Sequence, residues 1–199
     1  MTADVVHDFT LAPLDWRPYV APVELDHATP EQLDAMQVTP SNTGVSPYVL
    51  VLAHEASMLA ERSPLFNDIM YSTGGLSRGG REMGALAASV VNRCIYCAGV
   101  HANRHLHLEK RPASIDEIFA RQTAAVLSEP DQALYDFGVD LTSDPGNPGH
   151  MQFHRLREIG LDDLEIMDLI HAVAVFGWAN RLMHTLGEPT LKPDRKGAD

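Results

Sequence analysis

Cys94 and Cys97, the only two cysteines of the chain, form a C-x-x-C motif in the segment NRCIYCAGVH, which ends at His101. On a helix the two cysteines lie one turn apart, a spacing compatible with a disulfide. Cys97 and His101 are four residues apart and therefore side-chain neighbours. A helix that begins near Cys94 stabilises a thiolate through its dipole and its free N–H groups. The motif predicts two thiols that oxidise reversibly beside an imidazole base.

Two thiols beside a base are the minimum set of groups required to reduce a peroxide. A thiolate attacks the O–O bond and becomes a sulfenic acid, and a second thiol condenses with the sulfenic acid to give a disulfide. A zinc site that adds His101 and His105 to the cysteines is one alternative. Because Cys94 and His105 would be about 16 Å apart along a straight helix, one tetrahedral ion cannot bind all four side chains. We therefore expect no metal and no cofactor, while a structural pair of reduced thiols stays open.

Composition excludes several classes of partner. The 199 residues carry a formal net charge of −12, with 45% hydrophobic and 21% charged residues. Because no basic stripe is present, we expect neither nucleic acid nor an anionic membrane surface as a partner. The start of the chain does not resemble a signal peptide, and no apolar run reaches the roughly 18 residues of a membrane span. We therefore expect a cytoplasmic protein, where a C-x-x-C motif is typical of catalysis or metal binding.

The elements that must position these residues are helices, and the predicted fold class is all-α. Prolines within residues 1–28 prevent a long helix and predict an extended N-terminal arm. Its large apolar side chains favour packing on the body or on a neighbouring subunit, and a partly disordered tail is the alternative. Residues 29–199 are predicted to form one helical domain without β-strands. Apolar periodicity predicts the following helices: 29–36, 46–61, 63–72, 81–92, 94–109, 114–127, 129–142 and 164–186.

Local signals give several of the predicted helix starts. Thr29 with Gln32 and Ser114 with Glu117 have the spacing of capping boxes. Asp162 or Asp163 is predicted to begin the last long helix. In LSRGGREM two glycines precede Glu82, and they predict a late start for the helix that carries this carboxylate.

The motif resembles that of alkylhydroperoxidase D (AhpD)-like proteins in the carboxymuconolactone decarboxylase superfamily. The signature E-x11-C-x2-C-x3-H spans residues 82–101 and consists here of Glu82, Cys94, Cys97 and His101. Because the signature also fixes the number of residues between Glu82 and Cys94, it is much more specific than C-x-x-C alone. The segments TGVSPYVLVLAHEASML, EPDQALYDFGVDLTSDP and GLDDLEIMDLIHAVAVFGWANRLMHTLG resemble the peroxidase-related branch, so the resemblance covers roughly residues 28–190.

The resemblance implies an AhpD-like multihelical bundle that assembles as a homo-oligomer, either a dimer or an assembly of dimers. It implies an antioxidant peroxidase in which Cys97 attacks the hydroperoxide and Cys94 resolves the product. Glu82 and His101 would relay protons, and a lipoyl-bearing or thioredoxin-like dithiol protein would be the reductant. The chain departs from AhpD at Tyr96, where AhpD has a second histidine, so the relay is expected to be shorter here.

Physical magnitudes favour the same assignment of the thiols. A hydrogen bond between His101 and Cys97 would be worth about 1.5–3 kcal/mol. The helix dipole, which favours Cys94, is typically worth about 0.3–1 kcal/mol. His105, one turn beyond His101, either assists it or faces solvent, and His184 is either a site residue or a core or interface histidine.

Two other functions stay open. A redox-sensing or structural interaction protein could use the same dithiol to alter a surface that binds a partner. A decarboxylase-like enzyme is also compatible with the superfamily, but this chemistry needs no paired thiols, and the C-x-x-C motif argues against it.

Overall fold

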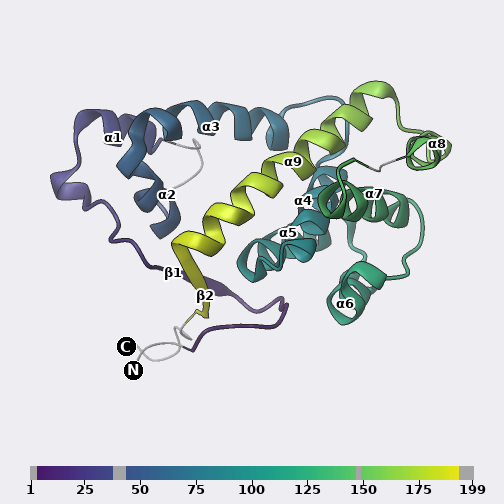
Figure 1. Cartoon of the computed structure of the whole chain (residues 1–199), viewed down its shortest axis with the longest axis horizontal. Helices are drawn as coiled ribbons and strands as arrows, with labels where there is room; N and C mark the ends of the chain where they lie inside the picture. Colours follow the sequence, from purple (N-terminus) through teal and green to yellow (C-terminus); the bar gives the residue numbers. More distant parts are fainter. Residues whose placement is uncertain (1–3, 38–43, 147–148, 193–199) are drawn as a thin grey trace.

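Helix α4 (Arg78–Val91) is the centre of the fold, and nearly all of its residues are buried. The computed structural model describes residues 4–37, 44–146 and 149–192. Three helices pack around α4: α5 (Ile95–Glu109), α7 (Asp131–Ser143) and the long α9 (Asp163–Leu186). These neighbours cover α4 on nearly all sides. The described residues form mostly helices, with only two short strands, so the predicted all-α class is confirmed (Figure 1).

The remaining helices lie around this central group. In Figure 1, α9 runs between α1–α3 on one side and α4, α5 and α7 on the other. The further α-helices are α1 (Pro30–Ala35), α2 (Pro47–Leu52), α3 (Ala56–Tyr71), α6 (Pro112–Arg121) and α8 (His150–Glu158). Short 3-10 turns are formed by Leu25–His27, Ala53–Glu55 and Gln122–Ala124. Within the described ranges, none of the helices has the length and apolar character needed to cross a membrane.

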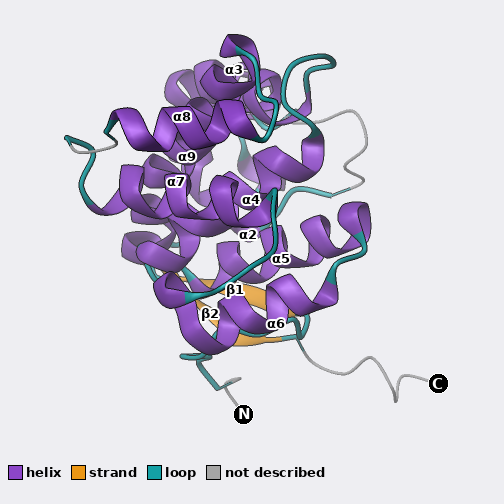
Figure 2. Ribbon diagram, turned by 90° about the vertical axis from the view of Figure 1, so that its right-hand side faces the viewer, coloured by secondary structure: helices purple, strands orange, loops and turns teal. Residues whose placement is uncertain are grey.

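The N-terminal arm contains a strand, which the sequence did not predict. Strand β1 (Leu14–Pro18) pairs antiparallel with β2 (Gly187–Leu191), as Figure 2 shows. In the register of this pair Trp16 faces Pro189. The Trp16 side chain is buried, and its Nε1 donates a hydrogen bond to the carbonyl of Met183 at 3.3 Å. The ring lies so close to Gly187 that a Cβ there would collide with it. The arm is therefore anchored on the end of α9 of its own chain.

The start of α4 corrects one prediction. Ser77 caps the helix by accepting a hydrogen bond from the Gly80 N–H at 3.1 Å, so both glycines lie inside the first turn and the start is early, not late. The physical reason is this cap, which fixes the first helical turn across both glycines. A Cβ at Gly79 would meet the Glu109 carboxylate, the flexible end of a side chain of α5. The absence of a side chain here therefore permits contact between two helices and does not end one.

Two further boundaries differ from the predictions. Helix α3 runs through Pro64, and the break lies at Ala53–Glu55 instead of at residue 62. Ser114 forms no capping box, because its hydroxyl donates to Asp131 Oδ2 at 2.7 Å and α6 begins two residues earlier. The predicted capping box of Thr29 is confirmed, and Asp162 caps α9 in the same way.

Candidate active site

The turn between α4 and α5 positions the predicted site residues. Arg93 adopts a left-handed conformation with φ of 53°, and the Cys94 N–H donates to the Ser89 carbonyl at 2.8 Å. This turn ends α4 and makes Cys94 the N-cap residue of α5, as the sequence predicted. Helix α5 then packs along α4. The antiparallel pair of α4 and α5 therefore brings the Glu82 carboxylate of α4 beside His101 in the second turn of α5.

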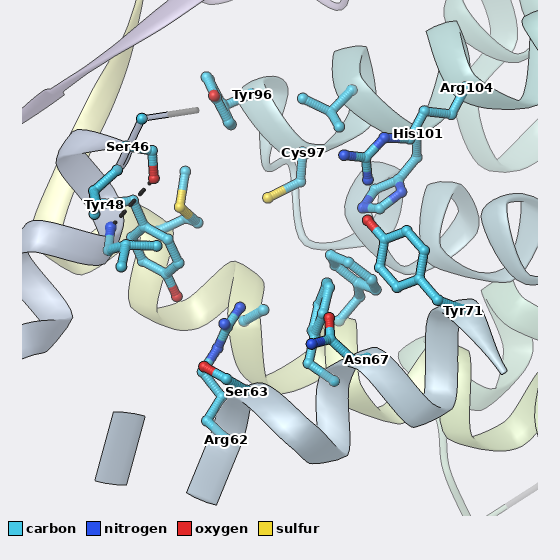
Figure 3. A pocket seen from close by; sticks show the side chains of 18 residues that line it. Ser46, Tyr48, Arg62, Ser63, Asn67, Tyr71, Tyr96, Cys97, His101 and Arg104 are labelled. Carbon is cyan, nitrogen blue, oxygen red and sulfur yellow. Dashed lines mark hydrogen bonds between the residues drawn. The ribbon is translucent and has the colours of Figure 1, made fainter. Parts of the chain in front are cut away.

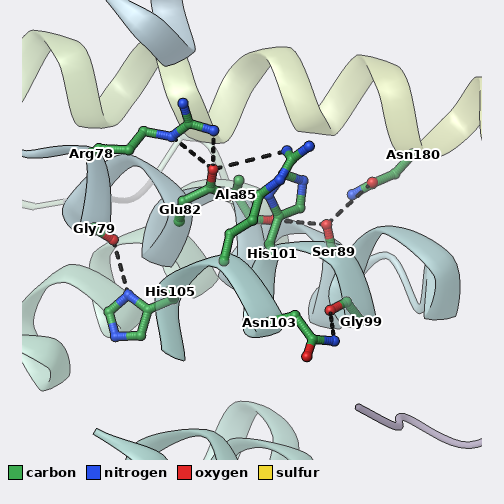
Figure 4. A network of polar contacts seen from close by, with 11 residues as sticks. Arg78, Gly79, Glu82, Ala85, Ser89, Gly99, His101, Asn103, His105 and Asn180 are labelled. Atoms are coloured by element: carbon green, nitrogen blue, oxygen red, sulfur yellow. Dashed lines mark hydrogen bonds and ion pairs between the residues drawn. The ribbon is translucent and has the colours of Figure 1, made fainter. Parts of the chain in front are cut away.

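Glu82 and His101 form a buried pair at the contact of these two helices (Figure 4). Their side chains are 0% and 1% exposed, and His101 Nδ1 lies 2.5 Å from Glu82 Oε2. Because an ionised carboxylate only accepts hydrogen bonds, Nδ1 carries the proton and Nε2 keeps its lone pair. Nε2 is buried and has no hydrogen-bond partner in the part of the chain that the structure describes. The pair is therefore oriented to present a basic nitrogen.

The electrostatic surroundings fix the charges of this pair. Burial raises the pKa of Glu82, but the nearby His101 and the Arg78 guanidinium lower it more, to about 2. Arg78 also hydrogen-bonds Glu82 Oε1, and Arg104 lies 3.9 Å from the same oxygen. Burial lowers the pKa of His101, against the raising effect of Glu82. The arrangement is thus a fixed carboxylate beside a neutral imidazole, which is suited to general-base catalysis.

Both cysteines are buried and reduced, and they lie one beside the other at the start of α5. A hydrogen bond with the Cys94 side chain raises the pKa of Cys97, and burial raises it further. The charge of Arg62 acts in the opposite direction. Among the described residues, no three or more His, Cys, Asp or Glu side chains gather in a way that could hold a metal ion.

A cavity of about 440 Å³ joins Cys97 to His101. No hydrogen bond links the sulfur to the imidazole among the described residues, and in Figure 3 the Cys97 sulfur points away from the ring. The two side chains therefore share a cavity without a direct hydrogen bond between them. The cavity lies between α2, α3, α5 and α9, and its other lining residues include Tyr48, Arg62, Phe66, Tyr71, Val100, Arg104, Phe176 and Met183.

Cys94 faces a different space. It lines a second cavity of about 340 Å³ beneath the N-terminal arm, together with Trp16, Arg93 and His184. Cys97 does not line this second cavity, and Cys94 does not line the first one. The two thiols are thus in contact with each other but open toward separate cavities.

The additional histidine candidates lie outside the pairing of Glu82 with His101. His105 is buried, so the solvent-facing alternative is wrong. Its Nδ1 lies 3.0 Å from the Gly79 carbonyl, a contact that ties α5 to the start of α4. His184 is exposed, which excludes a core position, and its Nε2 lies 2.9 Å from the Asn92 carbonyl. Neither side chain lines the cavity that contains Cys97.

The sequence did not single out Arg62 and Tyr48, which also line the cavity of Cys97. Both come from helices that precede the C-x-x-C motif, and Arg62 and Tyr48 lie 32 and 46 residues before Cys94. Their positions follow from the packing of α2 and α3 beside α9, for which the sequence carries no local signal.

Comparison with known proteins shows which family and which solved structures this chain resembles. The model of the carboxymuconolactone decarboxylase family matches residues 58–137. A solved peroxidase-related protein from Ralstonia eutropha JMP134, described as an alkylhydroperoxidase AhpD core, is 27% identical, with a TM-score of 0.72 over 90% of this chain and 93% of that chain. A search of curated proteins found no match. These findings confirm the predicted similarity to AhpD-like proteins of the superfamily and support a peroxidase-related role in general terms.

More distant structures share the fold alone. A peroxidase-related protein from Silicibacter sp. TM1040 is 22% identical, with a TM-score of 0.67 over 85% of this chain and 91% of that chain. The debrominase Bmp8 is 16% identical, with a TM-score of 0.67 over 85% of this chain and 90% of that chain. A variant of Bmp8 has been solved in complex with 2,3,4-tribromopyrrole. The fold therefore occurs with more than one activity, and function must be argued from the site.

Proposed function

We propose that the protein is an AhpD-like, thiol-dependent peroxidase that reduces hydroperoxides through a dithiol/disulfide cycle of Cys94 and Cys97. One observation carries the proposal: the cavity of Cys97 also contains His101, whose Nδ1 is fixed by Glu82 and whose Nε2 has no partner among the described residues. A nucleophile and an oriented base around one ligand-sized space are the parts that such a reaction requires.

The proposed cycle begins with proton transfer. His101 Nε2 takes the proton of Cys97 through the bound hydroperoxide or a water, and the thiolate attacks the terminal peroxide oxygen. The O–O bond breaks, the proton on His101 passes to the departing alkoxide, and an alcohol leaves with Cys97 as a sulfenic acid. The Cys94 thiol then attacks the Cys97 sulfur, which forms the disulfide and releases water. Two electrons have passed from the dithiol to the peroxide.

We assign attack to Cys97 and resolution to Cys94, because only Cys97 lines the cavity that contains His101. The raised pKa of Cys97 opposes this assignment, since it keeps the thiol protonated in the resting protein. The assignment therefore depends on proton transfer to His101 once the substrate is bound. After peroxide treatment, a sulfenic-acid probe should label Cys97 in Cys94→Ser and label almost nothing in Cys97→Ser. The reverse pattern would reassign the thiols.

A dithiol protein, lipoyl-bearing or thioredoxin-like, is the reductant that the cycle requires. Cys94 faces the second cavity, so a donor thiol can approach the disulfide there while the substrate cavity stays separate. Because the cycle depends on a dithiol donor, we propose the reducing cytoplasm as its compartment.

We also propose that the protein is a homo-oligomer, a dimer or an assembly of dimers. Leu164, Met167 and Trp178 are exposed and follow one face of α9 at helical spacing. Such a stripe on the longest helix of the chain is typical of a surface that a second copy covers.

A steady-state assay with a panel of hydroperoxides and dithiol donors tests the proposed function. We expect many turnovers per chain, and we expect each serine variant of the two cysteines to abolish cycling. A protein that oxidises once and then stops would support the redox-sensing alternative. A superfamily activity that survives in Cys97→Ser would support a decarboxylase-like enzyme.

A further inference from the structure

The side chains that line the cavity beside Cys97 carry positive charge, although the protein as a whole is acidic. Two arginines, Arg62 and Arg104, line it, and no carboxylate does so among the described residues. The whole chain, in contrast, has a formal net charge of −12. Arg104 is partly exposed and shares its charge with Glu82, which lies 3.9 Å away. Of these two arginines, Arg62 forms no ion pair with a carboxylate in the part of the chain that the structure describes.

Arg62 is held among aromatic rings. Its guanidinium carbon lies 4.6 Å from the ring centroid of Phe66 and 5.9 Å from that of Tyr48. Its Nε is buried and has no hydrogen-bond partner in the described ranges. Because burial of a cation is unfavourable unless an anion compensates it, burial lowers the pKa of this side chain. The protein therefore maintains a partly buried cation beside the reactive thiol.

A second polar group at the same place lacks a partner. The Tyr48 hydroxyl is buried and forms no hydrogen bond with the described residues. Burial raises the pKa of this phenol, so it stays protonated and can donate. In Figure 3 the hydroxyl points toward the Arg62 guanidinium, and Cys97 and His101 lie elsewhere around the same cavity. The Tyr48 hydroxyl and the Arg62 guanidinium are thus two hydrogen-bond donors at one place in the cavity, separate from Cys97 and His101.

We propose that this cavity binds a hydroperoxide that carries a carboxylate on an apolar body, with the carboxylate at Arg62 and Tyr48 and the peroxide at Cys97 and His101. One positive charge and one neutral donor match a monoanion with two acceptor oxygens. Phe66, Phe176, Val100 and Met183 supply apolar walls, and about 440 Å³ lies within the range of small-molecule sites. The placement of the peroxide rests on the proposed function, whereas the carboxylate position does not.

A binding experiment tests the carboxylate position without any turnover. The probes are 4-isopropylbenzoate and its methyl ester, titrated calorimetrically into the wild type, Arg62→Gln and Arg62→Lys. Arg121→Gln, at an exposed arginine of α6, is the matched control. We expect the wild type to prefer the acid, and Arg62→Gln to weaken acid binding about tenfold or more without affecting the ester. Arg62→Lys should retain part of the preference, because it keeps the charge and loses the fork of donors. Tyr48→Phe should show a smaller loss.

Two outcomes of this titration would overturn the proposal. One is equal affinity of the wild type for acid and ester, and the other is unchanged acid binding in Arg62→Gln. Thermal melting of each variant shows whether it is folded before its affinity is compared.

Turnover then separates this inference from the proposed function. The substrates are cumene hydroperoxide with a para carboxylate and the methyl ester of the same compound. We expect Arg62→Gln to raise KM for the acid and leave KM for the ester unchanged. If Arg62 only stabilised the Cys97 thiolate, both substrates would lose kcat/KM equally, which would overturn the carboxylate subsite. If neither compound is reduced while the acid still binds through Arg62, the subsite stands and the peroxidase proposal fails.

Discussion

Replacing Glu82 by glutamine tests the fixed orientation of His101. The carboxylate accepts the His101 Nδ1 proton at 2.5 Å and leaves the Nε2 lone pair free. A glutamine amide has nearly the same shape, but it can donate its N–H to Nδ1. The imidazole can then carry its proton on Nε2, where it no longer acts as a base. We expect kcat of the peroxidase to fall by about 10²–10⁴-fold, the usual contribution of a positioned general base.

The same substitution has a calculable effect on stability. The pKa of Glu82 falls from its ordinary value of 4.5 to about 2 in the folded protein. This corresponds to about 3.5 kcal/mol, since one pKa unit equals about 1.4 kcal/mol. Because the folded-state pKa is the lower one, the contribution is present above pH 4.5 and is lost as the pH falls toward 2. We expect Glu82→Gln to be less stable than the wild type at neutral pH, with a difference that shrinks in acid.

Two assays measure these effects. Steady-state turnover between pH 5 and 9 gives the loss of kcat, and urea denaturation at several pH values gives the free energy of unfolding. Glu61→Gln, at an exposed glutamate of α3, is the control and should match the wild type in both. A folded Glu82→Gln protein with wild-type kcat would refute the role of the carboxylate. A stability difference that does not change between neutral and acidic pH would refute the calculation.

Three further predictions concern the scaffold and the assembly. Gly138→Ala places a Cβ 2.7 Å from the Ala87 side chain, so it should separate α7 from α4 and lower the free energy of unfolding by about 1–3 kcal/mol in urea; an unchanged value would contradict this packing. Trp16→Ala removes the buried anchor of the arm and should lower the free energy of unfolding by about 3–5 kcal/mol; a loss below 1 kcal/mol would mean that the arm is not anchored by this ring. Light scattering should give a mass above the 21.8 kDa of one chain, and Met167→Lys should reduce it; a wild-type monomer would disprove the assembly.

Much of the helical scaffold was predictable because its signals are local. Apolar periodicity placed most of the helices, and the capping box of Thr29 fixed one start to the residue. The spacing from Glu82 to His101 was also informative, because it brings the two side chains together across the turn between α4 and α5. These features depend on residues that are close in the sequence.

The features that escaped prediction depend on distant segments. Strand β1 exists because Trp16 and its neighbours pair with residues that follow α9, at the opposite end of the chain. Gly79 looks like a helix breaker until the Glu109 side chain that occupies its free space is known. Arg62 has no local mark at all, because its cavity forms only when four helices pack together.

In the proposed function Cys94 and Cys97 act together as a peroxide-reducing dithiol. The most direct test counts free thiols in the denatured protein before and after one equivalent of hydroperoxide, with mass spectrometry of the linked peptide. We expect two free thiols per chain to become none and one disulfide to join Cys94 to Cys97. Two free thiols after peroxide treatment would contradict it.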